Sequence, residues 1–295
     1  MTRNESFTVE IAGGLGNQLF MFYAGLYLQE HFQREVIFDL ADLARIQELH
    51  PGENIQSLGL LKGYQTKAGS IASKTTLELN ALRTKRLVAK FLKTTNFTSS
   101  EIGFINPDSI PSNINSVRCY FQSWFYFNSL VNKPILSIKN LSNPSSWLMS
   151  KIARTKTERV CSLHIRRGDY ALPANRMNGI LSIDYFREAL MLTRECDSTW
   201  IFTDSPKEVE QEFSQLDFSY ELIEPPNNSD PVESLLLMAA TKNIVISNST
   251  FSWWSAMLAG NASAIYAPSK WYEHRPDPNK LIPDDWSRIP SSWVE

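Results

Sequence analysis

Two adjacent arginines in the middle of the chain, Arg166 and Arg167, have the type and spacing that suit anion chemistry. They follow an apolar run and precede Gly168 and Asp169. Guanidinium forks fit phosphate oxygens, and each charge-assisted hydrogen bond contributes roughly 1.5–3 kcal/mol. Successive strand residues point in different directions, so both arginines could serve one ligand only if the chain turns at Gly168. The stretch predicts a site for a doubly charged anion; the alternative is a surface pair bridged to Asp169.

A group of hydroxyl side chains near the C-terminus, Ser249, Thr250 and Ser252, opens a predicted helix. A helix N-terminus offers hydroxyl and backbone N–H donors to a phosphate group. The alternative is ordinary helix capping. Because this group and the arginine pair both follow predicted strands, they form two anion-binding loops on one sheet edge and favour a diphosphate ligand.

A glycine turn near the N-terminus carries Gly14 and Gly16 at the predicted start of another helix, where backbone N–H groups face a ligand. The dinucleotide-binding fingerprint needs a third small residue where this chain has Leu19, which disfavours a nicotinamide or flavin site. Asn17 and Gln18 supply a cap and an amide side chain, and these suit a hydroxyl-rich ligand instead.

The elements that must position these residues alternate along the chain. The strand patterns cover residues 7–11, 34–40, 159–165, 199–203, 220–223, 244–247 and 262–266, and the aromatic run over 117–127 predicts a buried strand followed by a loop. The helix patterns cover residues 17–31, 75–93, 183–195, 206–216, 231–240 and 251–259. This order predicts an α/β fold with a parallel, doubly wound sheet, in which ligands bind at the carboxyl ends of the strands.

A polar interruption at residues 142–146 (Ser-Asn-Pro-Ser-Ser) predicts a boundary between two domains, residues 1–145 and 146–295. In the second domain, polar clusters fall where four predicted strands end. These clusters are residues 164–169, 203–205, 224–230 and 248–252. We therefore expect the anion to bind mainly to the second domain.

Composition narrows the class of protein. A formal net charge of -2 and a pI near 6.1 give no overall field that attracts nucleic acid. The 3 cysteines are widely spaced without a C-x-x-C pair, which disfavours a disulfide framework or zinc site and indicates a reducing compartment. Without a leader or a long apolar run, we expect a cytoplasmic protein. Basic side chains over 83–93 suit either peripheral contact with the inner membrane face or a solvated helix surface.

Three blocks of sequence carry a family resemblance. They are Gly-Gly-Leu-Gly-Asn-Gln-Leu-Phe at 13–20, His-Ile-Arg-Arg-Gly-Asp-Tyr at 164–170 and Asn-Ser-Thr-Phe-Ser-Trp-Trp at 248–254. In order and spacing they resemble the signature blocks of the bacterial α-1,2-fucosyltransferases. The resemblance implies a GT-B-like fold: two Rossmann-like domains with a cleft between them, the acceptor on the side of 1–145 and GDP-fucose on 146–295. It also implies an inverting transfer of L-fucose from GDP-fucose to the 2-hydroxyl of a terminal β-galactoside, during surface glycan or O-antigen biosynthesis.

The resemblance assigns roles to the matched positions. Arg166 and Arg167 would grip the pyrophosphate, and His164 would lie beside the nucleotide. Asn17 would face fucose or the acceptor together with Gln18. Further donor contacts are implied for Gly14, Gly16, Asp204, Glu233, Ser249, Thr250 and Ser252. Glu233 is included among these contacts because the family carries an acidic residue near position 234, where this chain has Ser234 with Glu233 beside it.

The chemistry of the residues agrees with this assignment. Negative charge develops on the β-phosphate of the leaving GDP, and arginines can stabilise it. No D-x-D triplet occurs, so no metal or other cofactor is expected. The acceptor, a galactose-terminated oligosaccharide or lipid-linked glycan, must lose a proton, for which Asp169, His164 and Asp204 are candidate bases. The alternatives are a fucosyltransferase of another linkage, one that takes another GDP-sugar, and a non-catalytic glycan-binding protein.

Overall fold

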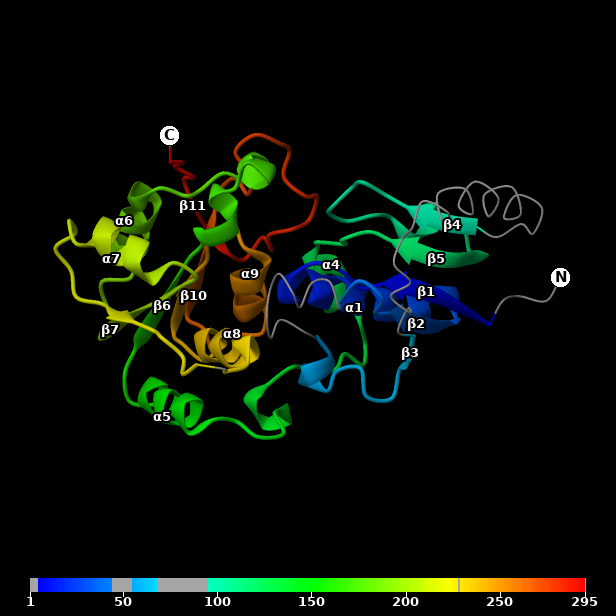
Figure 1. Cartoon of the computed structure of the whole chain (residues 1–295), viewed down its shortest axis with the longest axis horizontal. Helices are drawn as coiled ribbons and strands as arrows, with labels where there is room; N and C mark the ends of the chain where they lie inside the picture. The colour runs from blue at the N-terminus through cyan, green and yellow to red at the C-terminus, as the bar shows by residue number, and fades with distance from the viewer. Residues whose placement is uncertain (1–4, 44–54, 68–94, 228, 295) are drawn as a thin grey trace. The chain divides into compact units, whose positions relative to one another are not determined.

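The computed structural model describes residues 5–43, 55–67, 95–227 and 229–294, and the chain divides into two compact units. Unit 1 holds residues 1–56 and 60–133, and unit 2 holds residues 134–295 together with 57–59. Each unit has its own parallel sheet with helices packed on it (Figure 1). The predicted α/β class is therefore confirmed, while the cleft expected between the domains stays a prediction.

Unit 1 is built on a five-stranded sheet in the order β3-β2-β1-β5-β4, and every pairing is parallel. The strands are β1 (Ser6–Glu10), β2 (Glu35–Asp39), β3 (Gln65–Lys67), β4 (Thr95–Thr98) and β5 (Ile114–Arg118). The helices in its described residues are α1 (Leu15–Phe32) and α4 (Trp124–Ser129). α1 packs close to β2 because Gly25 leaves room for the ring of Phe38, where a Cβ would come within 2.7 Å.

One prediction in unit 1 was wrong. The aromatic run over 117–127 was expected to form a buried strand followed by a loop, but β5 ends at Arg118 and a helix, α4, begins at Trp124. The hydroxyl of Ser123 accepts the backbone N–H of Phe125 at 3.2 Å and caps this helix. A short apolar run gives no periodicity that separates a strand from a buried helix, so the cap decided the structure.

Unit 2 is built on a six-stranded parallel sheet in the order β11-β10-β9-β6-β7-β8. Its strands are β6 (Val160–Ile165), β7 (Ser198–Thr203), β8 (Glu221–Leu222), β9 (Asn243–Val245), β10 (Ala264–Pro268) and β11 (Ser287–Ile289). Its helices are α5 (Ser146–Thr155), α6 (Ile183–Leu192), α7 (Pro206–Phe213), α8 (Pro231–Ala239) and α9 (Thr250–Met257). The predicted alternation of strands and helices is confirmed, and α5 and β11 are additions to it.

The two faces of the unit 2 sheet carry different helices, as Figure 1 shows. Along β6 the odd-numbered residues from Cys161 to Ile165 pack against α6 and α7. Val160 belongs instead to the cluster formed with α5 and α8. Strand side chains alternate between the two faces of a sheet. The residues directly after Ile165 are therefore expected to point to alternate faces as well.

Short 3-10 helices complete the described chain: η1 (Ile55–Leu58), η2 (Pro107–Ser109), η3 (Ile138–Asn140), η4 (Gly168–Ala171) and η5 (Pro173–Asn178). The polar interruption at 142–146 lies inside unit 2, between η3 and α5. Of the helices in the described part, none is long and apolar enough to cross a membrane. The basic helix predicted over 75–93 lies outside the described residues.

Candidate active site

Arg166 emerges just beyond the carboxyl end of β6 and is held between two carboxylates. Its Nε and Nη2 donate to Oδ1 of Asp169 at 3.0 and 2.5 Å, and its Nη1 lies 3.0 Å from Oδ2 of Asp204. The side chain is 19% exposed. Burial lowers the pKa of Arg166, but the charges of Asp204 and Asp169 outweigh that effect and raise it. The site therefore presents a fixed, partly accessible guanidinium.

Arg167 points to the other side of the sheet. Its side chain is 1% exposed, and its Nε and Nη2 donate to the two carboxylate oxygens of Glu212 on α7, at 3.0 and 2.7 Å. The guanidinium also lies 5.8 Å from the ring centre of Phe186 on α6. The structure thus does not bring both arginines to one ligand, and it contradicts the expected turn of both side chains toward the same side.

Asp204 links the two arginines. Its Oδ1 accepts the backbone N–H of Arg167 at 3.0 Å, while Oδ2 faces the guanidinium of Arg166. The close approach depends on Gly168, where an added Cβ would lie 3.0 Å from Cγ of Asp204 and closer still to Oδ2. The donor contact that the resemblance implies for Asp204 stays a prediction, and in the structure Asp204 orients Arg166.

His164 lies on β6 on the same side as Arg166. Its Nδ1 is 2.8 Å from Oγ of Ser247, its ring centre is 5.9 Å from that of Phe251, and it is 6% exposed. Burial first, and then the charge of Arg166, lower its pKa to about 3. The imidazole is consequently neutral near pH 7 and is a poor proton acceptor.

The loop that opens α9 joins this cluster through Tyr170. The Tyr170 hydroxyl donates to the backbone carbonyl of Asn248 at 2.8 Å. Ser249 caps α9 by accepting the N–H of Phe251 at 3.4 Å, and the buried Ser252 hydroxyl donates to the Ser249 carbonyl at 3.2 Å. The structure therefore brings the second predicted loop next to the first, although capping already occupies the Ser249 and Ser252 hydroxyls.

Thr250 and Glu233 differ in how free they are to bind a ligand. Thr250 is the first residue of α9 and is partly exposed. Glu233 is 6% exposed, and its carboxylate accepts the N–H and the hydroxyl of Ser145 at 2.7 and 2.5 Å. The structure gives Glu233 a bracing contact between α8 and the N-terminus of α5, and its expected donor contact stays a prediction.

The predicted residues of unit 1 gather at the start of α1, beyond the carboxyl end of β1. Gln18 is fully buried; its amide donates to the Gly13 carbonyl and accepts from Ile55, both at 2.8 Å. Asn17 is partly exposed and accepts from the amide of Gln122 at 2.8 Å. Gly14 is the N-cap of α1, and Gly16 is buried in its first turn. Gln18 therefore stabilises the turn, whereas Asn17 remains the better placed for a ligand.

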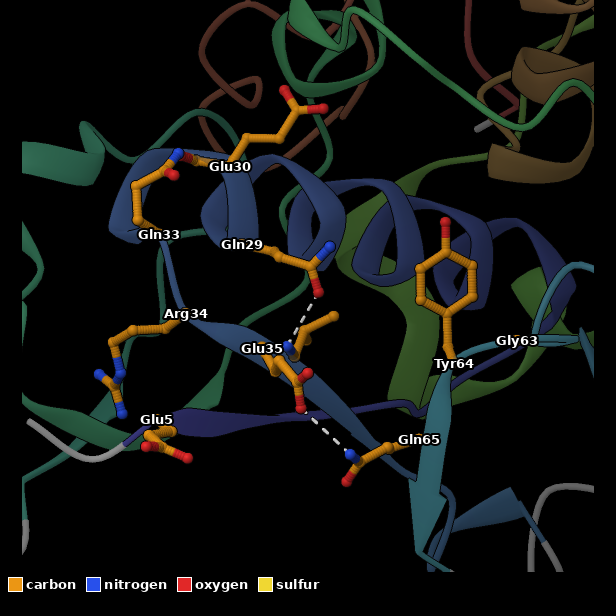
Figure 2. A pocket seen from close by; sticks show the side chains of 10 residues that line it. Glu5, Gln29, Glu30, Gln33, Arg34, Glu35, Gly63, Tyr64 and Gln65 are labelled. Atoms are coloured by element: carbon orange, nitrogen blue, oxygen red, sulfur yellow. Dashed lines mark hydrogen bonds between the residues drawn. The ribbon is translucent and has the colours of Figure 1, made fainter.

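A separate hollow of about 690 Å³ lies in unit 1, at the end of α1 opposite Asn17 (Figure 2). Its lining includes three glutamates: Glu5 and Glu35 at the amino ends of β1 and β2, and Glu30 near the C-terminus of α1. The guanidinium of Arg34 is bonded to backbone carbonyls, among them those of Ser6 and Ile114 at 2.5 and 2.8 Å. None of the predicted site residues lines this hollow, and ligands of parallel sheets bind at the opposite, carboxyl edge.

Sequence reasoning missed Glu212 and Ser247 as partners of the site. Glu212 is one of several acidic residues on α7, and nothing in the pattern distinguishes it from Glu208 or Glu210. Ser247 follows β9 in the sequence and could have been found, because strands β9 and β6 are neighbours and both end at this edge.

Comparison with known proteins identifies the family of the chain. The model of glycosyl transferase family 11 matches residues 103–287. An Escherichia coli O-antigen biosynthesis glycosyltransferase, WbnK, is 28% identical over 309 residues, covering 95% of this chain and 99% of the relative. An Escherichia coli alpha-1,2-colitosyltransferase is 26% identical over 297 residues, covering 95% and 97%.

A solved structure shares the fold. The glycosyl transferase family 9 protein of Veillonella parvula aligns with a TM-score of 0.50 at 11% identity, over 98% of this chain and 86% of that one. At this identity the likeness concerns the fold alone. It agrees with the two parallel sheets of the structure and confirms the GT-B-like class expected from the sequence.

Proposed function

The chain belongs to glycosyl transferase family 11, the family of the α-1,2-fucosyltransferases, and on that premise we propose its reaction. The enzyme transfers L-fucose from GDP-fucose to the 2-hydroxyl of a terminal β-galactoside, with inversion, in O-antigen or surface glycan biosynthesis. The observation that carries this proposal is the family match over 103–287, which includes the Arg166 cluster and the start of α9. The name of the WbnK relative supports the O-antigen context.

Arg166 performs the central electrostatic task in this proposal. Negative charge builds up on the β-phosphate as the bond to fucose breaks, and a preorganised cation stabilises that charge more in the transition state than in the ground state. Asp169 and Asp204 hold the guanidinium in place before substrate arrives. The cation takes the place of a metal ion, so the reaction is proposed to be metal-independent.

The acceptor hydroxyl loses its proton to a weak base. His164 is unsuited to this task, because burial lowers its pKa to about 3. Asp169 and Asp204 are the carboxylates next to Arg166, with 32% and 26% of their side chains exposed. We propose that one of them accepts the proton and that Asn17 orients the sugar. The decisive comparison is kcat for Asp169→Asn against Asp204→Asn at equal donor saturation.

A second candidate donor follows from the colitosyltransferase relative. Colitose is the 3-deoxy form of L-fucose, so a GDP-colitose donor would present the same diphosphate and guanine. The two differ by one hydroxyl, which a site built to hydrogen-bond it would distinguish strongly. A comparison of kcat/KM for GDP-fucose and GDP-colitose on one acceptor separates these candidates.

The proposed function is tested by incubating the purified protein with GDP-fucose and lactose in the presence of EDTA. We expect GDP release and a product whose NMR spectrum shows an α-1,2 linkage. Arg166→Met should abolish turnover, while the matched Arg187→Met, a half-exposed arginine paired with Asp184, should not. Absence of product with a panel of galactosides and both donors would reject the proposal. Binding of galactosides without GDP binding or turnover would instead support a glycan-binding role. Activity lost only in EDTA would reject metal independence.

A further inference from the structure

The arginine pair does not neutralise a diphosphate by itself. Arg166 faces Asp169 and Asp204, and Arg167 is paired with Glu212. Two guanidinium groups are therefore set against three carboxylates, and the formal charge of this cluster is negative. A nucleoside diphosphate is also negative, so favourable binding needs another cation at the same edge of the sheet.

Arg275 is a cation in the right part of the fold. It lies in the loop between β10 and β11, which follows the carboxyl end of β10 in the sheet that contains β6. Figure 1 shows this orange-to-red loop beside the green segment that follows β6. The contact is direct, because Nη2 of Arg275 donates to Oδ1 of Asn178, the last residue of η5, at 2.9 Å.

The guanidinium of Arg275 is positioned but not neutralised. Its Cζ lies 3.6 Å from the ring centre of Tyr272, which fixes its plane. Its Nε–H is buried and has no hydrogen-bond partner among the residues the structure describes. No carboxylate within that described part forms an ion pair with it. A buried donor without a partner is costly, and an anionic ligand would relieve that cost.

Arg275 also belongs to the network that surrounds Arg166 and the start of α9. Asn178 and Gly179 accept hydrogen bonds through their carbonyls from the Asn248 amide, both at 3.1 Å. The Asn248 carbonyl accepts the hydroxyl of Tyr170, whose ring centre is 5.6 Å from Cζ of Arg166. Burial raises the pKa of Tyr170, and the charges of Arg166 and Arg275 both oppose that rise, so both cations lie near one phenol.

We propose that Arg275, and not Arg167, is the second arginine that binds the diphosphate of the donor, together with Arg166. Arg167 is a positioning residue on the opposite face of the sheet. This inference rests on the proposed nucleotide-sugar donor but goes beyond it, because it assigns a binding residue outside the three sequence blocks. It also explains how a cluster of negative formal charge takes an anion.

The test compares Arg275→Gln and Arg275→Lys with Arg187→Gln, using calorimetric titration of the full chain. The ligands are GDP, inorganic pyrophosphate and guanosine. Arg275→Gln should weaken GDP and pyrophosphate roughly 10- to 100-fold, the loss of one or two charge-assisted hydrogen bonds. Arg275→Lys should recover part of this loss, Arg187→Gln should change nothing, and guanosine should bind all variants alike. Circular dichroism checks that each variant is folded.

The outcomes separate this inference from the proposed function. Unchanged GDP and pyrophosphate affinity in folded Arg275→Gln and Arg275→Lys would overturn the inference, even for an active fucosyltransferase. In another outcome the wild-type chain binds pyrophosphate but not GDP, and Arg275→Gln loses the pyrophosphate binding. That result would support the inference and reject the GDP-sugar donor. Equally weakened binding of guanosine would overturn the inference, because a side chain that contacts only the phosphates cannot affect a nucleoside without phosphate.

Discussion

Replacing Glu212 by leucine should destabilise unit 2 far more than the same change at a neighbouring glutamate. The substitution leaves Arg167, whose side chain is 1% exposed, without its carboxylate partner. Breaking a buried ion pair from one side typically costs about 3–5 kcal/mol, because the remaining charge is buried and uncompensated. Glu212 is itself 29% exposed, so solvent screens part of the pair and we expect about 3 kcal/mol, the lower end.

The assay is thermal unfolding followed by circular dichroism. For a unit of this size, a loss of about 3 kcal/mol lowers Tm by roughly 6–12 °C. Glu210→Leu on the same helix is the matched control, because that residue is exposed and forms no ion pair within the described chain. Adding Arg167→Met should recover at least half of the loss, since the long apolar side chain can pack on Phe186. Equal effects of Glu212→Leu and Glu210→Leu would refute the reasoning.

Two further predictions concern the same edge of the sheet. His164, with its pKa lowered to about 3 by burial, should make stability fall as pH drops below the unfolded value near 6.5, because only the unfolded chain then binds the proton. The free energy of unfolding, measured with urea, should fall between pH 7 and pH 5 by about 2 kcal/mol less in His164→Gln than in the wild type. An equal fall in both proteins would contradict the low pKa. Gly168→Ala should push Asp204 away from Arg166 and weaken GDP binding at least roughly 10-fold by calorimetry, the loss of a charge-assisted contact. Gly260→Ala, whose added Cβ meets nothing within 4 Å, should bind GDP like wild type.

Much of unit 2 could be predicted from the sequence because its strands and helices alternate with clear periodicity. Every predicted strand from 159 onward has a counterpart in the sheet, and every predicted helix there begins within a residue of its prediction. Ser145, Ser182, Asp230 and Ser249 cap helices where capping residues were available. The prediction for the aromatic stretch of unit 1 missed α4 because a short apolar run fits a strand or a helix equally well. The Ser123 cap decided in favour of the helix.

The positions of the site residues were predictable, but several of their partners were not. The sequence locates Arg166, Asp204 and Ser249 after their strands, and the shared sheet edge brings them together. It does not reveal that Glu233 would accept both donors of Ser145, or that Arg275 would approach Asn178. These contacts join segments distant in sequence, and their geometry depends on how helices and loops pack onto the sheet.

The side chains of the two adjacent arginines lie on opposite sides of the sheet, as the alternation along β6 predicts. His164 lies near Phe251 of α9 and Arg166 lies between Asp169 and Asp204, whereas Ile165 and Arg167 pack toward α6 and α7. The prediction that both arginines bind one ligand required a turn at Gly168 to overcome this alternation. The turn does exist, but it serves Asp204, which accepts the backbone of Arg167 with one oxygen and faces Arg166 with the other. Loss of Glu212 should therefore reach the donor site through Asp204, and weaken GDP binding without any contact between Glu212 and GDP.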